Sequence, residues 1–151
     1  MTEKEKDEAF EFVLDKVSRN ALAKLQMDPN DERYVSLVGF ILVHFSETNT
    51  DEYLIQLAQR YLAHEDIRMA EEEVRDIVLK TREKCDRQQF ALETAFDQIE
   101  NNNLSGEEVY ENLRPFLSRS VWVWIPPGPS DDREKKNADF FSKTFAYFKF
   151  L

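Results

Sequence analysis

Apolar residues recur at helical spacing through most of the chain, with charged residues filling the positions between them. Residues 4–27 show this pattern first, and "DPND" then interrupts it, because Pro29 cannot continue a helix. Residues 31–47 are apolar on nearly every side, which predicts a central, buried helix. Thr50 precedes the next apolar face and is placed to cap a third helix.

Residues 66–100 contain neither glycine nor proline, and an apolar stripe that starts at Ile67 and Ala70 runs through them. As one helix this stretch would be about 50 Å long, which is longer than a domain of this size is wide. We therefore expect a break or bend in the polar sequence "KTREKCDRQQ" of residues 80–89. The alternative is a single projecting helix that pairs with a second copy of the chain.

The stretch "FDQIENNNLSGEEVYENL", residues 96–113, places acids and amides between two helical patterns, as calcium-binding loops do. A 12-residue calcium loop needs an oxygen ligand at its fifth position and glycine at its sixth, but Leu104 and Ser105 stand there. Ser105 followed three residues later by Glu108 is instead typical of a helix capping box. We predict a turn capped by Ser105, and a helix that stops or kinks near Pro115.

The end of the chain has a different character. "VWVWIPPGP" predicts a short extended segment around 121–129, and the sequence after it predicts a C-terminal helix, although the last seven residues also fit a strand. Residues 113–151 hold 9 of the 19 aromatic residues and carry 7 basic against 4 acidic side chains. We expect the aromatic-rich segment 116–151 to pack on the helical domain.

These elements together predict a mainly α fold. We expect residues 1–151 to form a single-domain antiparallel bundle of about five to six helices, with the extended segment leading into the C-terminal helix.

Composition and charge narrow the classes of partner. The chain of 151 residues is acidic, with 30 acidic and 20 basic residues and a net charge of −10, which disfavours binding to duplex DNA. Its longest apolar run, "VGFILV", is far shorter than the roughly 20 residues that cross a bilayer, so we expect no membrane insertion. The first residues lack a secretory h-region, and Cys85 is the single cysteine. We expect an intracellular, cytoplasmic protein.

Few residues suggest catalysis or metal binding. His44 and His64 are the only histidines, and imidazole suits iron or zinc. Paired metal ligands in a bundle have the form Glu-x-x-His or His-x-x-x-His, and the sequence has neither. It also lacks a phosphate-binding glycine loop and a nucleophile elbow. We expect no cofactor and no catalytic residue, and a buried, hydrogen-bonded role for these histidines.

The candidate partner-binding residues are aromatic and lie in the basic C-terminal segment, where exposed rings suit a peptide or unstacked bases. They are Trp122, Trp124, Phe140 and Tyr147.

The leading functional hypothesis is a non-enzymatic protein–protein interaction module, such as an adaptor, an assembly factor or a regulatory subunit. A second hypothesis is a helical metal- or haem-binding enzyme or sensor that uses His44 or His64. A third is contact with single-stranded nucleic acid through the C-terminal segment. A homodimer through residues 66–100 or the C-terminal helix is a further prediction.

Overall fold

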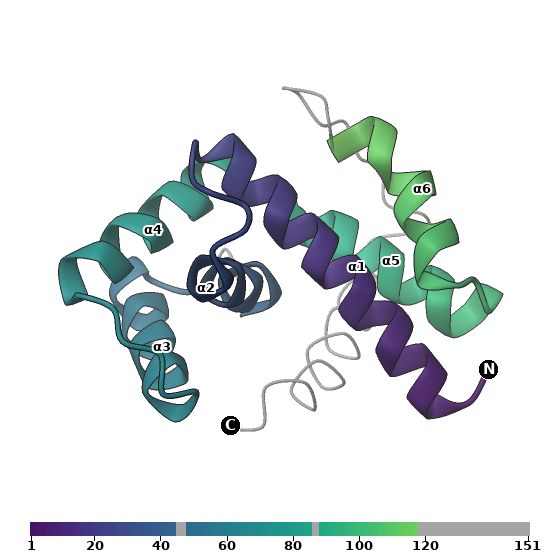
Figure 1. The fold of residues 1–151 in the computed structure, drawn as a ribbon, viewed down its shortest axis with the longest axis horizontal. Coiled ribbons are helices and arrows are strands. Elements are labelled where there is room, and N and C mark those ends of the chain that lie inside the picture. Colours follow the sequence, from purple (N-terminus) through teal and green to yellow (C-terminus); the bar gives the residue numbers. More distant parts are fainter. Residues whose placement is uncertain (45–47, 86–87, 118–151) are drawn as a thin grey trace.

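A computed structural model of the chain describes residues 1–44, 48–85 and 88–117, and this part of the chain forms an all-α helical bundle (Figure 1). The predicted mainly α fold is confirmed. The extended segment at 121–129 and the C-terminal helix lie outside the described residues. The helices are α1 (Glu3–Lys24), α2 (Glu32–His44), α3 (Asp51–His64), α4 (Glu71–Lys84), α5 (Gln88–Asn102) and α6 (Gly106–Leu117).

Helix α1 lies in the middle of the bundle and joins its two sides. Helices α2, α3 and α4 lie on one side of it, and α5 and α6 lie on the other (Figure 1). Helix α2 is seen nearly end-on while α1 runs across the view, so these two helices cross steeply (Figure 1). Within the described ranges, no helix combines the length and the apolar character that a membrane span requires.

Helices α1 and α5 run antiparallel. Near the start of α1, the Lys6 ammonium lies 3.8 Å from a Glu100 carboxylate oxygen near the end of α5. Near the end of α1, Asn20 accepts a hydrogen bond of 3.4 Å from Gln88 at the start of α5. The two contacts show that the chain direction reverses between these helices, as expected for an antiparallel bundle.

Helix α2 supplies much of the core. All of its residues from Leu37 to His44 are buried, which confirms the predicted central helix. Its apolar residues face neighbours on several sides, since α2 contacts α1, α3, α4 and α5. The prediction extended this helix over residues 31–47, and residues 45–47 lie outside the described part.

Helix α1 ends at Lys24, three residues before the predicted end at residue 27. Gln26 adopts a left-handed conformation, with φ of 59°, and the Met27 N–H donates to the Leu22 carbonyl at 2.9 Å. This is the Schellman arrangement, in which a left-handed residue lets the chain turn back onto the last helical turn. Pro29 therefore follows the end of the helix and does not cause it.

The same arrangement corrects the prediction for residues 66–70. Asp66 is left-handed, with φ of 54°, and the Ile67 N–H donates to the Leu62 carbonyl at 2.8 Å. These contacts close α3, so Ile67 and Ala70 precede α4 and do not belong to a helix, contrary to the apolar stripe. Ile67 still packs against the core from this connection.

The long stretch between residues 66 and 100 is broken, as expected, within residues 80–89. Buried Cys85 caps the end of α4 through its N–H, which donates to the Thr81 carbonyl at 2.8 Å. The next helix begins at Gln88. The alternative of one projecting helix is wrong, and Cys85 lies at the end of α4.

Two predicted caps are confirmed. The Thr50 hydroxyl accepts a hydrogen bond from the backbone N–H three residues later, at 3.1 Å, and Ser105 does the same at 3.2 Å. The stretch between α5 and α6 is thus a capped turn. Pro115 lies inside α6, which continues to Leu117, so the helix does not stop at this proline, and the alternative of a kink there stays a prediction.

Candidate functional site

The aromatic residues predicted to bind a partner all lie outside the described residues. Their contribution to binding therefore stays a prediction. They are Trp122, Trp124, Phe140 and Tyr147.

His44 is buried at the end of α2 in a stack of aromatic rings. Its ring centroid lies 4.4 Å from that of Phe40, and Phe40 stacks on Tyr61 of α3 at 4.5 Å with an interplanar angle of 8°. Burial lowers the pKa of His44 to about 4, because a buried imidazole disfavours the charged form. At neutral pH this histidine is therefore an uncharged member of the core.

His64 has a different environment, since it is exposed at the end of α3. In the part of the chain that the structure describes, no group of three His, Cys, Asp or Glu side chains is arranged to hold a metal ion. The structure thus places His44 and His64 in unlike surroundings, one buried and one exposed.

A groove between α1 and α2 has a volume of about 330 Å³. Tyr61 reaches it from α3. Glu11 and Asp15 of α1 bring carboxylates to it, and Ser18 and Ser36 bring hydroxyls. Its apolar lining is formed by Leu14, Val35, Gly39 and Tyr61.

The groove lies where two small residues let the helices approach. A Cβ atom on Gly39 would lie 2.9 Å from the Ser18 Oγ, which is closer than such atoms pack. The Ser18 hydroxyl donates to the Leu14 carbonyl at 2.7 Å, so it is held in place within its own helix. The missing side chain at Gly39 thus permits the crossing of α2 over α1.

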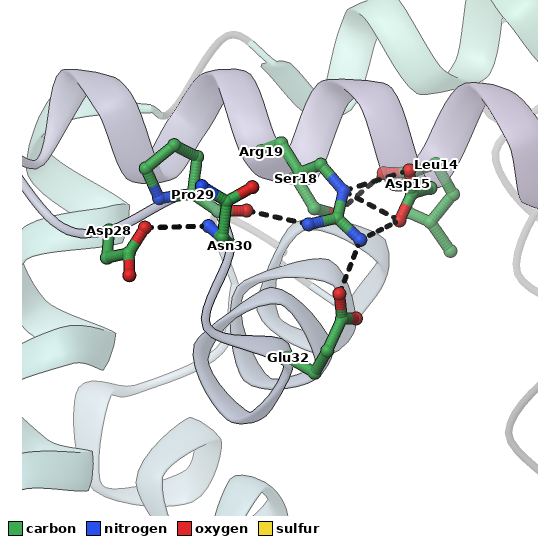
Figure 2. Close-up of polar contacts among 8 residues, drawn as sticks. All are labelled: Leu14, Asp15, Ser18, Arg19, Asp28, Pro29, Asn30 and Glu32. Atoms are coloured by element: carbon green, nitrogen blue, oxygen red, sulfur yellow. Dashed lines mark hydrogen bonds and ion pairs between the residues drawn. The ribbon is translucent and has the colours of Figure 1, made fainter.

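Arg19 fixes the position of α2 relative to α1 (Figure 2). Its Nε donates to both carboxylate oxygens of Asp15, at 3.0 and 3.1 Å. Its Nη1 donates to the Pro29 carbonyl at 2.7 Å, and its Nη2 donates to Glu32 at 2.8 Å. The hydrogen bonds that Arg19 donates to Asp15, and then to Glu32, raise the pKa of Arg19 well above its ordinary value. One guanidinium therefore joins α1, the connection and the start of α2.

The connection between α1 and α2 is shaped to meet Arg19. Asp28 accepts a hydrogen bond of 2.9 Å from the Asn30 N–H, which makes a tight turn around Pro29 (Figure 2). The turn presents the Pro29 carbonyl to the guanidinium. The sequence identified the turn, but it did not show that Arg19 would bind it.

Tyr61 lines the groove and also belongs to the aromatic stack described above. Burial raises the pKa of the Tyr61 phenol above its ordinary value, and the nearby charge of Glu65 raises it further. A hydrogen bond with Ser36 lowers the same pKa. The phenol is therefore protonated at neutral pH. Its ring is buried, and one face stacks on Phe40.

The mouth of the groove is acidic. Glu8, Glu11 and Asp15 lie three and four residues apart on α1, so they follow one face of the helix. Asp15 is already paired with Arg19, whereas Glu11 is exposed and has no ion-pair partner among the described residues. A cationic side chain placed above the groove would therefore meet Glu11 at little desolvation cost.

Sequence reasoning did not find this site. Its only signal was the occurrence of a small residue in each helix, Ser18 in the first and Gly39 within the apolar run of the second. Small residues at a helix surface are compatible with a close crossing, but they do not say which helix crosses there.

Comparisons with known proteins give no relative. No protein family, no curated protein and no solved structure matches the chain.

Proposed function

We propose that this protein is a non-enzymatic protein–protein interaction module, and that a segment of its partner binds in the groove between α1 and α2. An adaptor, an assembly factor or a regulatory subunit would each use such a module. The partner segment would place an apolar side chain against Leu14 and Tyr61 and a lysine or arginine beside Glu11.

The observation that supports this proposal is the combination of an apolar floor with an acidic mouth that is open to solvent. Recognition sites of this kind take an apolar anchor for affinity and a few placed polar groups for orientation. The Ser36 side chain, which is half-buried at the same groove, provides a further polar group. The Arg19 contacts and the close approach at Gly39 hold the two helices in position before a partner arrives, which reduces the entropy cost of binding.

The C-terminal aromatic residues remain proposed as a second contact. Trp122 and Trp124 stand before the proline-rich sequence, and Phe140 and Tyr147 follow it. Such rings are common anchors of protein interfaces. They would extend the interface beyond the groove.

The experiment compares partners that co-purify with the full chain and with three variants. Glu11→Lys reverses the charge at the mouth, and Ser36→Phe places a ring in the groove. The matched control is Glu83→Lys, which makes the same charge change at an exposed position of α4. All variants are first shown to melt cooperatively.

We expect the first two variants to lose the same set of co-purifying proteins, while Glu83→Lys retains them. Equal recovery of every protein by Glu11→Lys, Ser36→Phe and the parent would contradict the proposal.

A further inference from the structure

The side chains at the groove between α1 and α2 offer hydrogen-bond acceptors and no cation. Glu11 and Asp15 bring carboxylates to it, and Ser36 brings a hydroxyl. The residues that line the groove, all within the described part of the chain, include no lysine, arginine or histidine. An occupant of the groove therefore has to bring donors, and a positively charged donor suits two carboxylates best.

Leu14 supplies the accessible apolar surface of the groove. The other apolar side chains that line it, those of Val35 and Tyr61, are buried, whereas Leu14 is half-buried. Leu14 follows Glu11 by three residues, so the two lie one turn apart on the same face of α1. An occupant that reaches Glu11 from the groove therefore lies along Leu14.

We infer that the side chain which this groove takes from a partner is an arginine, with its methylene stem on Leu14 and its guanidinium against Glu11. Arginine lays its stem on apolar surface while its charged end stays near water. Its planar guanidinium has five donors in a fixed fork that matches a carboxylate at two points, whereas a lysine ammonium is a compact and more strongly hydrated charge. Ser36 is a further acceptor, since a hydroxyl keeps a lone pair beside the hydrogen bond that it shares with Tyr61.

The charge around the groove favours this occupant even though Arg19 is close. Arg19 alone would repel a second cation, but its guanidinium is already paired with Asp15 and Glu32. Together with Glu11, these side chains carry three negative charges and one positive charge, a net charge of −2. Glu11 is exposed and has no ion pair among the described residues, so an arginine can meet it without displacing an existing contact.

The size of the groove limits the occupant to a side chain. Its volume of about 330 Å³ is at the lower end of the roughly 300–1,000 Å³ typical of ligand pockets. The partner's backbone would therefore stay outside it. This inference rests on the proposed function and narrows it: arginine, and not lysine, lies beside Glu11, and its stem shares the surface of Leu14 with the apolar side chain of the partner segment.

Titration with N-acetyl-arginine methylamide, followed by the NMR signals of the Leu14 methyl groups, tests the inference. The matched probes are the lysine amide and the citrulline amide, which has the shape of arginine but a neutral end. We expect saturable shifts with the arginine amide, with a Kd on the order of 1 mM, about tenfold weaker binding of the lysine amide, and none of the citrulline amide. Glu11→Gln should weaken arginine binding about tenfold, as the loss of a hydrogen bond to a charged group does. The control Glu83→Gln, at an exposed position of α4, should leave it unchanged.

The inference is overturned if the arginine amide gives no saturable shift, if the lysine or citrulline amide binds equally well, or if Glu11→Gln binds arginine as the parent does. Should one of these results come with a Glu11→Lys variant that still loses its co-purifying proteins, the groove is a partner site that recognises another side chain. If the arginine amide binds as expected while co-purification is unchanged, the preference for arginine stands and the proposed function fails.

Discussion

The Ser18 hydroxyl occupies the space that a side chain at position 39 would need, and Gly39 leaves that space open. The two residues lie on different helices, and the 2.9 Å between the Ser18 Oγ and a Cβ at position 39 is too short for both to be present without movement. The position of the α1–α2 crossing, and of the groove beside it, therefore depends on this pair.

The first prediction concerns the coupling of these two residues. In an unobstructed helix, Gly→Ala stabilises by about 1 kcal/mol. We expect Gly39→Ala to destabilise instead, by about 1–3 kcal/mol, because the methyl group must displace the Ser18 hydroxyl from the Leu14 carbonyl. In a Ser18→Ala background the same change should cost much less. Urea denaturation of the two single variants and the double variant gives the coupling energy, and additive effects would show that the residues do not touch.

A second close approach leads to a second prediction. A Cβ atom on Gly106, at the start of α6, would lie 2.9 Å from the Ala9 carbonyl oxygen and 3.1 Å from the Phe12 Cβ. Because a backbone atom cannot rotate away, we expect Gly106→Ala to destabilise the fold by about 1–3 kcal/mol. Glu107→Ala, at the next and exposed position, should stay within about 0.5 kcal/mol of the parent. Equal thermal midpoints for the two variants would contradict the packing of α6 on α1.

The third prediction concerns acid. The folded-state pKa of His44 is about 4, below its unfolded value of 6.5, so the unfolded chain takes up this proton first as the pH falls. Stability that is fully present above pH 6.5 is therefore lost progressively down to about pH 4. With about 1.4 kcal/mol for each pKa unit, the loss amounts to about 3 kcal/mol. Urea unfolding at several pH values measures it.

The His44→Gln variant separates this histidine from other titrating groups. We expect the variant to be less stable at pH 7 but to lose less stability between pH 6.5 and 4. The control His64→Gln, at an exposed position, should keep the full acid loss that His44 causes. An unchanged slope in His44→Gln would show that this residue is not a buried, neutral side chain.

The fourth prediction concerns the capped turn before α6. Ser105→Ala should destabilise by about 1 kcal/mol, since it removes the acceptor of the hydrogen bond from the Glu108 N–H. Ser105→Asp should retain most of the stability because its carboxylate can accept the same bond. If thermal melts place both variants equally below the parent, the loss does not come from the cap.

The sequence predicted the helices well wherever the apolar stripe and the capping residues agreed. Thr50 and Ser105 are examples, since each cap requires only a few neighbouring residues. The ends at Lys24 and His64 were not predicted. They depend on left-handed Gln26 and Asp66, and these residue types give no strong local signal for that conformation.

The groove was beyond sequence reasoning for a different reason. It forms where α1 and α2 cross. The residues that set the position of this crossing, Ser18 and Gly39, are separated in the chain by the end of α1 and the turn around Pro29. Arg19 is a further example: its charge was visible in the sequence, but its three acceptors come from two helices and the connection between them. Tertiary arrangement, and not local propensity, creates both features.

The central place of α1 has a consequence for the synthesis of the protein. Helix α1 is synthesised before the helices that cover its two sides. Asn20 cannot form its hydrogen bond with Gln88 until that residue, 68 positions later in the chain, has been synthesised. At synthesis rates of about 5–20 residues per second, that partner follows roughly 3–14 s afterwards. During this interval one apolar side of α1 can already pack on α2, while Phe10 and its neighbours face water. A nascent chain that stalls before α5 would therefore expose an apolar surface of α1, to which ribosome-associated chaperones would bind.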